Sequence, residues 1–403
     1  GILRALAKGG MGQVSVARDT ELDREVALKE IQPRFRLDDA TLHRFMLEAR
    51  VTGRLEHPGV VPVYGLGAYD DGRPYYAMRF ITGRSFGDAI DEFHDADKPG
   101  RDPQERSFAL RQLLRRFVDV CNTIGYAHSK GILHRDIKPA NVMLGAYGET
   151  LVVDWGLAKD MADGRKPDGG EGPPVAVMPD LSVDTFSGPG DKYAGYDETK
   201  EGFTYMGQTM GTPAYMSPEQ AAGKWDVTGV ASDVYSLGAM LYVLLSGTPP
   251  YSGPSYEVIT RVQKGDYKPV ILVKGSTPAP LDAIVRKAMA FEIKDRYTTA
   301  LALAHDVEKW LADEPVSCYR EPFLVRAHRW TRRHRTKVIA AGVVFATGTI
   351  ALAVGLFAVE AEQARTKVAR DEARGALVTL TDDAIGEFLA GSAKLTPSQE
   401  KFL

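Results

Sequence analysis

Cysteine is scarce in this sequence, with only Cys121 and Cys318 among 403 residues. The two lie far apart in the chain, and Cys121 falls inside an apolar helical pattern. Small secreted domains that depend on disulfide bonds carry many more cysteines. The sequence therefore excludes a disulfide framework and predicts two reduced, structural thiols.

An excess of charge of either sign is also lacking. Lysine and arginine total 50, aspartate and glutamate total 53, and the net charge is −3. Binding to nucleic acid through the overall field needs a marked positive excess, so no nucleic-acid partner is expected. The apolar share of 44% and the charged share of 26% are those of an ordinary globular protein. At this length the chain can form two or three domains.

No signal peptide is visible at the start of the chain. The sequence begins with Gly1 rather than Met, already inside an apolar run. We therefore expect a fragment, and the sequence leaves open whether a further segment precedes Gly1.

One long apolar run stands out, at residues 338–359, where 22 residues carry no charge. A helix rises about 1.5 Å per residue, so this run can cross a hydrocarbon core about 30 Å thick. The alternative is a buried core helix, but the uncharged run is longer than helices of globular proteins need. The sequence therefore predicts one transmembrane helix.

The charges beside this helix predict its orientation. A basic segment at residues 313–337 precedes it, whereas Glu360 and Glu362 follow it. Because positive charge stays on the cytoplasmic side, we expect the preceding chain in the cytoplasm and residues 360–403 outside the cytoplasmic (inner) membrane. Trp330 is expected at the interface, and anionic lipid is a better partner for the basic segment than nucleic acid.

Beyond the span, residues 360–403 are charged and alanine-rich. The pattern is helical up to Arg374 and amphipathic again at residues 376–389. We expect a stalk or the start of a further domain.

The chemistry of the chain centres on residues 134–141, which read His-Arg-Asp-Ile-Lys-Pro-Ala-Asn. Asp136, Lys138 and Asn141 supply a carboxylate, a cation and an amide within one short loop. Phosphoryl transfer requires such fixed polar groups, because its catalysis consists mostly of positioning and charge neutralisation. A solvated turn is the alternative, but the other motifs that this chemistry needs occur in the required order.

A glycine-rich turn lies near the N-terminus. Gly9, Gly10 and Gly12 interrupt two strand patterns, at residues 1–6 and 15–18. Glycines let backbone amides approach phosphates without hindrance from a Cβ atom. Many β-hairpins carry such turns, so this signal is weak by itself.

The next strand and helix carry a charged pair. A strand at residues 25–30 places Ala27 and Lys29 on one face, and a helix at residues 42–55 contains Glu48. A strand lysine and a helix glutamate are usually solvated. After a glycine-rich hairpin, Lys29 can instead reach bound phosphates, with Glu48 paired to it.

Two strands at residues 60–64 and 75–80 follow, and Gly83 marks a hinge. Beyond it the pattern becomes helical, apart from a strand at residues 151–156 that ends in an acidic turn. Residues 160–206 are rich in Gly, Pro and Asp and predict a long, mobile insertion. The helices expected in this part lie at residues 107–129, 233–246, 281–290 and 299–311.

Together these motifs resemble those of the eukaryotic-like Ser/Thr protein kinase family, in its bacterial membrane-anchored branch. The resemblance covers about residues 1–312, with the motifs in the family's order. It implies an α+β protein kinase fold with two lobes, followed by the single transmembrane helix. The small β-rich N-lobe would span about residues 1–82, and the larger helical C-lobe about residues 83–312.

The resemblance also implies an ATP site. Lys29 would bind the α- and β-phosphates, and Glu48 would orient Lys29. Met78 falls at the family's gatekeeper position. The other residues expected around the nucleotide come from the loop, the strands and the hinge: Ala7, Gly9, Gly10, Gly12, Val14, Ala27, Phe80 and Ile81.

The catalytic roles follow from the same resemblance. Asp136 would accept the proton of the substrate hydroxyl, and Lys138 would neutralise the γ-phosphoryl group. Asn141 and Asp154 would hold Mg²⁺, with Mn²⁺ as the alternative cation. Lys138 and Thr212 resemble the Ser/Thr-specific pattern, so proteins with Ser or Thr acceptors are the expected substrates of a non-specific serine/threonine protein kinase.

Three residues depart from the family pattern. Ala7 stands at the first loop glycine, Trp155 replaces the Phe after the metal-binding Asp, and Ser217 replaces the Ala of the Ala-Pro-Glu motif. Ala7 should alter nucleotide affinity slightly, and Trp155 should pack as a bulky apolar group whose indole N–H needs a partner. The catalytic polar residues are all present, which argues against a pseudokinase.

Three further residues are expected to be structural. Glu219 and Arg296 would form the family's buried ion pair. Asp233 places an acid at the N-terminus of its helix, where a negative charge is favoured.

Regulation by phosphorylation is also implied. In family members with an arginine at the position of Arg135, a phosphorylated activation-loop residue pairs with that cation and orders the loop. Thr204 and Thr209 precede Gly211 and are the candidate sites, with Thr204 favoured. We expect autophosphorylation in transmembrane signalling, with a homodimer as the activating arrangement.

Two other functions compete with this interpretation. A membrane receptor scaffold could bind nucleotide without turnover, but intact Lys29, Asp136, Asn141 and Asp154 argue against it. A small-molecule kinase on the same fold is disfavoured by residues 211–219, which in protein kinases cradle a peptide.

Overall fold

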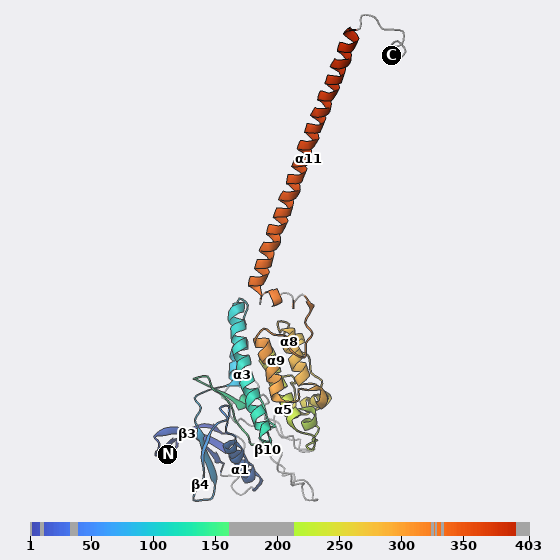
Figure 1. The fold of residues 1–403 in the computed structure, drawn as a ribbon. Coiled ribbons are helices and arrows are strands. Elements are labelled where there is room, and N and C mark those ends of the chain that lie inside the picture. The colour runs from blue at the N-terminus through green and yellow to red at the C-terminus, as the bar shows by residue number, and fades with distance from the viewer. Residues whose placement is uncertain are drawn as a thin grey trace. The chain divides into compact units, whose positions relative to one another are not determined.

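A computed structural model describes residues 2–8, 12–32, 39–160, 213–323, 326, 329–331 and 334–391 of the chain. It divides into two compact units, Gly1–Arg320 and Glu321–Leu403. The first unit contains a sheet region (residues 2–82) and a helical region (residues 83–320), shown in Figure 1. The predicted α+β class is confirmed.

The sheet region is built on five antiparallel strands in the order β1-β2-β3-β5-β4. Along β3, Ala27, Lys29 and Ile31 alternate on the buried face, as the period of two in strands requires. The strands are β1 (Ile2–Lys8), β2 (Gly12–Asp19), β3 (Arg24–Ile31), β4 (Val63–Ala68) and β5 (Pro74–Arg79).

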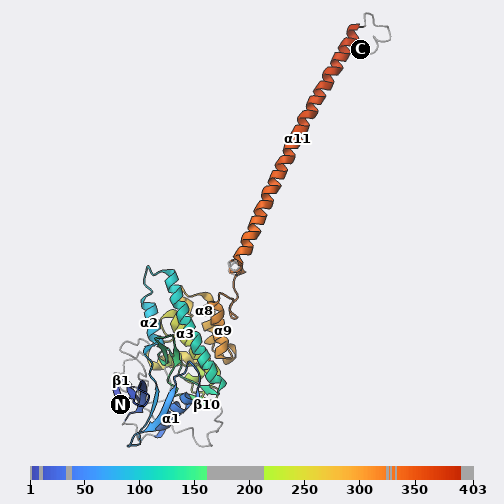
Figure 2. The same cartoon turned by 60° about the vertical axis from the view of Figure 1, so that its left-hand side comes forward.

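Helix α1 (Asp39–Arg54) packs against β4 and β5, and it lies beside the sheet in both Figure 1 and Figure 2. Its Phe45 and Ala49 join Val14, Tyr76 and other sheet residues in one buried cluster. The predicted helix at residues 42–55 is confirmed, with an earlier start.

The predicted strand at residues 60–64 is wrong in its first half, because β4 begins only at Val63. Pro62 has no amide hydrogen to donate to a sheet, so it interrupts pairing. Val60 instead forms an isolated parallel bridge with Val152 in the helical region. This segment therefore ties the two regions together.

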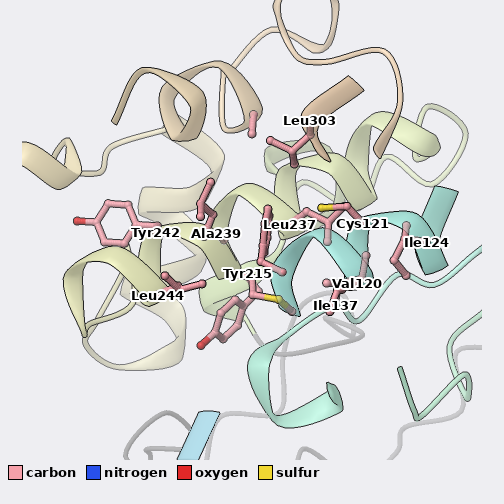
Figure 3. Close-up of a cluster of buried hydrophobic side chains, with 14 of the residues drawn as sticks. Val120, Cys121, Ile124, Ile137, Tyr215, Leu237, Ala239, Tyr242, Leu244 and Leu303 are labelled. Atoms are coloured by element: carbon pink, nitrogen blue, oxygen red, sulfur yellow. The ribbon is translucent and has the colours of Figure 1, made fainter. Parts of the chain in front are cut away.

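The helical region surrounds α5 (Val230–Ser246), which is buried along almost its whole length. A helix that is apolar on all sides belongs in a core. Figure 3 shows its Leu237, Ala239 and Leu244 among side chains from other segments of this region, including Cys121 and Leu303.

Helices α3 (Pro103–Ser129) and α9 (Ala300–Leu311) run side by side in this core. A Cβ atom at Gly125 of α3 would lie 2.8 Å from the Leu301 side chain, so glycine permits the close approach. The other helices in the described part of the region are α2 (Phe86–Asp95), α4 (Pro218–Ala221), α6 (Ser255–Lys264), α7 (Val270–Val273) and α8 (Ala279–Ala288), with 3₁₀ turns η2 (Pro139–Asn141), η3 (Pro213–Tyr215) and η4 (Ile293–Asp295).

The helical region also contains five short strands among its described residues. Two sheets form, with β6 and β9 flanking β8 and with β10 beside β7. The strands are β6 (Gly83–Ser85), β7 (Ile132–Leu133), β8 (Val142–Gly145), β9 (Thr150–Val152) and β10 (Lys159–Asp160). Gly83, predicted as a hinge, pairs within β6 with Gly145 of β8.

The second unit consists mainly of α11 (Arg335–Gly391), a single helix of 57 residues. It is long and apolar enough to cross a membrane, and its apolar window is exposed. The sequence pattern predicts separate helical stretches on either side of Gly375. The structure instead continues one helix through this residue.

Glu219 and Arg296 form the predicted ion pair in the helical region. Arg296 donates from Nη1 and Nη2 to the two carboxylate oxygens over 2.7 and 2.8 Å, and both side chains are buried. Ser232 Oγ also donates to Glu219 Oε1 over 2.6 Å. Burial by itself would raise the pKa of the Glu219 carboxyl, but the hydrogen bonds and charge of Arg296 lower it.

Replacing Glu219 with Gln should therefore destabilise the chain strongly. The substitution leaves the Arg296 charge buried without its counter-ion, a change that costs about 3 kcal/mol or more. Thermal unfolding of the full chain in detergent, followed by tryptophan fluorescence, should show a lower midpoint. Glu292→Gln, at an exposed position of the same region, should leave the midpoint unchanged. Equal midpoints for the two variants would contradict this role of the pair.

Candidate active site

The loop at residues 134–141 is fixed by a buried carboxylate from another part of the chain. Asp233, in the first turn of α5, accepts the backbone N–H of His134 and of Arg135, each over 2.9 Å. His128 Nε2 donates to the same carboxylate over 2.8 Å. Burial would raise the pKa of Asp233, but these donors lower it, so the carboxylate stays ionised.

Arg135 adopts a strained backbone conformation at this point, with φ at 70°. Such a conformation costs a non-glycine residue about 1–3 kcal/mol and persists only where its surroundings hold it. Asp233 holds its N–H, and Gln220 Nε2 donates to its carbonyl over 3.1 Å. The turn therefore sets the direction in which the next residue, Asp136, points.

Asp136 receives two side-chain donors from its own loop. Asn141 Nδ2 donates to Asp136 Oδ2 over 3.1 Å and to its backbone carbonyl over 2.8 Å. Lys138 Nζ lies 3.2 Å from the same carboxylate oxygen. The structure thus brings together the three polar residues that the sequence selects from this stretch.

Lys29 and Glu48 form an ion pair between β3 and α1. Lys29 Nζ lies 2.6 Å from Glu48 Oε1, and both side chains are buried. Burial would lower the pKa of Lys29, but the charges of Glu48 and Asp154 raise it, so the ammonium group stays charged. The predicted pairing is present, and it places a cation beside Asp154.

Lys29 and Glu48 line a cavity together with residues of the sheet. Asp154, with φ at 64°, follows β9 and faces the cavity with Lys29 and Glu48. The other lining residues are Val14, Thr52, Val61, Tyr76, Met78 and Val153. The sequence selects five of these residues for the nucleotide or metal site: Val14, Lys29, Glu48, Met78 and Asp154.

The other predicted nucleotide contacts are more peripheral. Phe80 and Ile81, which follow β5, pack against the cluster that contains Ala27. Ala7 pairs with Val14 across β1 and β2. At Gly12 a Cβ atom would lie 2.9 Å from the carbonyl of Glu30, so a larger residue does not fit there.

Several predicted residues lie outside the described part of the chain. These are Gly9, Gly10, Thr204, Thr209 and Thr212.

The donor set fits a cation that binds together with phosphates. Within the described residues, no group of three or more His, Cys, Asp or Glu side chains could hold a metal ion. Mg²⁺ is usually held by one or two carboxylates and completes its shell with substrate phosphates and waters. Asp154 and Asn141 supply one carboxylate and one amide, which suits that arrangement.

Trp155 is fully buried at the turn after Asp154. Its ring lies 4.6 Å from the His134 ring, and its indole N–H donates to the Val152 carbonyl over 3.4 Å. The prediction of a bulky apolar group with a satisfied N–H is confirmed. Trp155 therefore packs the acidic turn against the loop at residues 134–141.

The sequence did not point to Tyr76, His128 and Gln220, which form hydrogen bonds with groups of the site. Tyr76 donates its hydroxyl to Glu48 Oε1 over 2.8 Å. A signal was available for this residue, because Tyr76 and Met78 share one face of β5 and a buried tyrosine needs a hydroxyl partner. His128 bonds the Asp233 carboxylate and Gln220 bonds the Arg135 carbonyl, and both partners lie far along the chain, where no local pattern reveals them.

Known proteins resemble this chain over the same region. The protein kinase domain family matches residues 2–307. Serine/threonine-protein kinase PknD of Chlamydia abortus is 33% identical over 316 residues, covering 78% of this chain and 31% of that protein. Serine/threonine-protein kinase PknD of Protochlamydia amoebophila is 30% identical over 313 residues, covering 77% of this chain and 30% of that protein.

This chain thus spans about a third of the length of these relatives. The match covers the sheet region and almost all of the helical region, including each site residue described above. The chain therefore belongs to the protein kinase family, among the bacterial Ser/Thr protein kinases.

Proposed function

We propose that this chain transfers the γ-phosphoryl group of Mg-ATP to Ser or Thr hydroxyls of proteins, its own included. The observation that carries the proposal is the Asp136 carboxylate, held by Lys138 and Asn141 on a loop that Asp233 fixes. A general base must lie at a set position relative to the hydroxyl that it deprotonates. A non-catalytic scaffold would need none of this arrangement.

Each residue of the site would have a separate role in phosphoryl transfer. Lys29 would bind the α- and β-phosphates, with Glu48 holding it in place through the 2.6 Å ion pair. Asp136 would orient the acceptor hydroxyl and take its proton, while Lys138 would neutralise the γ-phosphoryl group. When bound, Mg²⁺ neutralises charge on the phosphate oxygens, and Asn141 and Asp154 are the residues that would hold it.

Arg135 supports a regulatory part of the proposal. Its guanidinium Nε is buried without a hydrogen-bond partner among the described residues. Burial lowers the pKa of this guanidinium, although the charge of Asp233 acts in the opposite direction. A phosphate on Thr204 would supply a counter-ion, as a phosphorylated loop residue does when it pairs with an arginine.

We further propose that the chain is anchored in a membrane. Residues 1–312 would form the kinase domain, residues 313–337 a basic juxtamembrane segment and residues 338–359 the span. The basic segment favours a cytoplasmic kinase domain, with residues 360–403 outside the inner membrane. The length and apolar composition of α11 support this arrangement.

Replacing Asp136 with Asn tests the catalytic proposal. The amide cannot accept the hydroxyl proton, so phosphate incorporation into a Ser/Thr-containing protein should fall by about 10²- to 10⁴-fold. The measurement is transfer of radiolabel from γ-labelled ATP with Mg²⁺ present. Asp226→Asn, at an exposed position, serves as the control and should keep full activity. Equal incorporation by wild type and Asp136→Asn would favour the scaffold.

Phosphosite mapping tests the regulatory part. After incubation with Mg-ATP, wild type should carry phosphate on Thr204, and Thr204→Ala should lose about tenfold in activity, or about 1.4 kcal/mol of transition-state stabilisation. Arg135→Gln should lose a similar amount, with no further loss in the double variant. Thr298→Ala, at an exposed position away from this loop, is the matched control. Finding phosphate on neither Thr204 nor Thr209 would contradict the assignment.

Carbonate extraction of bacterial membranes tests the anchor. Wild-type chain should stay in the membrane fraction, whereas Val344→Arg with Leu352→Arg should release it, because each arginine costs about 2.5–3.5 kcal/mol at the centre of a span. Val368→Arg with Leu377→Arg places the same charges farther along α11 and should leave the chain anchored. Release of wild type by carbonate would exclude a membrane span.

A further inference from the structure

The Glu48 carboxylate has a second buried partner besides Lys29. Oxygen Oε1 accepts Lys29 Nζ over 2.6 Å and the Tyr76 hydroxyl over 2.8 Å. The three side chains come from β3, α1 and β5, and all are almost fully buried, with Glu48 and Tyr76 each 2% exposed. Glu48 Oε2 has no hydrogen-bond partner within the described residues. The orientation of this carboxylate therefore depends on two donors to one oxygen.

Tyr76 is the more rigid of these two donors. Its Cα pairs with that of Lys29 on one side and with that of Leu66 on the other, so the residue lies inside the sheet. Its ring packs against Phe45 of α1, with centroids 5.3 Å apart. A tyrosine has few rotatable bonds, whereas the long lysine side chain has many. The hydroxyl therefore presents a fixed donor to α1.

A purely apolar residue would fill this position if packing were the only requirement. Burying a hydroxyl is unfavourable unless it is hydrogen-bonded, and a hydrogen bond to an ionised carboxylate is a strong one. Tyr76 also lines the same cavity as Lys29 and Met78. The Tyr76 hydroxyl thus bonds the same Glu48 oxygen, Oε1, that pairs with Lys29.

We propose that Tyr76 is a positioning residue: its hydroxyl holds Glu48, and with it α1, where Glu48 pairs with Lys29. The inference rests on the proposed phosphoryl transfer, in which Lys29 binds phosphates. Tyr76 itself acts through Glu48 and does not contact the reacting atoms. Without the hydroxyl, Glu48 Oε1 keeps a single, flexible donor, and the Lys29 ammonium is less well placed for ATP.

Tyr76→Phe isolates the hydroxyl, because it keeps the ring against Phe45. In the full chain, the KM for ATP should rise and kcat should fall, with kcat/KM lower by about tenfold, or about 1.4 kcal/mol. Tyr69→Phe is the matched control, because it removes a tyrosine–carboxylate hydrogen bond of 2.6 Å to Glu30 on the same sheet. That variant should keep wild-type kinetics.

A double-mutant cycle separates positioning from packing. If Tyr76 acts through Glu48, Tyr76→Phe should have no further effect on kcat/KM in a Glu48→Gln background. Additive losses, or wild-type kinetics with only a lower unfolding midpoint, would overturn the proposal.

Equilibrium binding of a fluorescent ATP analogue distinguishes a failure of the role proposed for Tyr76 from a failure of the proposed phosphoryl transfer. Tyr76→Phe should weaken binding of the analogue several-fold even without an acceptor protein. Wild type that binds the analogue but phosphorylates no protein would contradict the proposed function alone. Unchanged binding by Tyr76→Phe beside an active wild type would contradict the role of Tyr76 alone.

Discussion

The site depends on one charge buried in the core, the Asp233 carboxylate. An ionised group at this depth is unfavourable unless hydrogen bonds replace the lost water, and here two backbone amides and His128 do so. Those same hydrogen bonds hold Arg135 in its strained conformation. The hydrogen bonds that stabilise the buried Asp233 charge are therefore the same ones that set the geometry of the site. A change that breaks them affects both.

The sheet region also contains a buried charge, that of Lys29, which an ion pair stabilises. The buried Lys29 ammonium needs a counter-ion, and Glu48 supplies it from a helix that packs against the sheet. Tyr76 ties the pair to the central strands. In each region a carboxylate on a helix holds a group of another segment. Asp233 of α5 holds the backbone of the loop at residues 134–141, and Glu48 of α1 holds Lys29 of β3. The cavity that Lys29 and Glu48 line is also lined by Asp154, which follows β9 of the helical region.

Much of the fold and site is predictable from sequence, for identifiable reasons. Apolar periodicity locates α3, an almost continuous apolar run locates α5, and compact motifs select Lys29, Glu48, Asp136 and Asn141. The strand predicted at residues 60–64 fails because Pro62 cannot donate to the sheet, while Val60 pairs with a distant segment. His128 and Gln220 escape prediction because their partners lie 105 and 85 positions away in the chain, whereas the place of Tyr76 beside Met78 on one face of β5 was a usable signal.

The unbroken course of α11 has a mechanical consequence. With 57 residues, the helix is about 85 Å long, nearly three times the thickness of a hydrocarbon core. It contains no proline, the residue that most often kinks a helix. The helix therefore offers no proline joint at which a twist or an axial displacement imposed near Gly391 would be absorbed before it reaches Arg335.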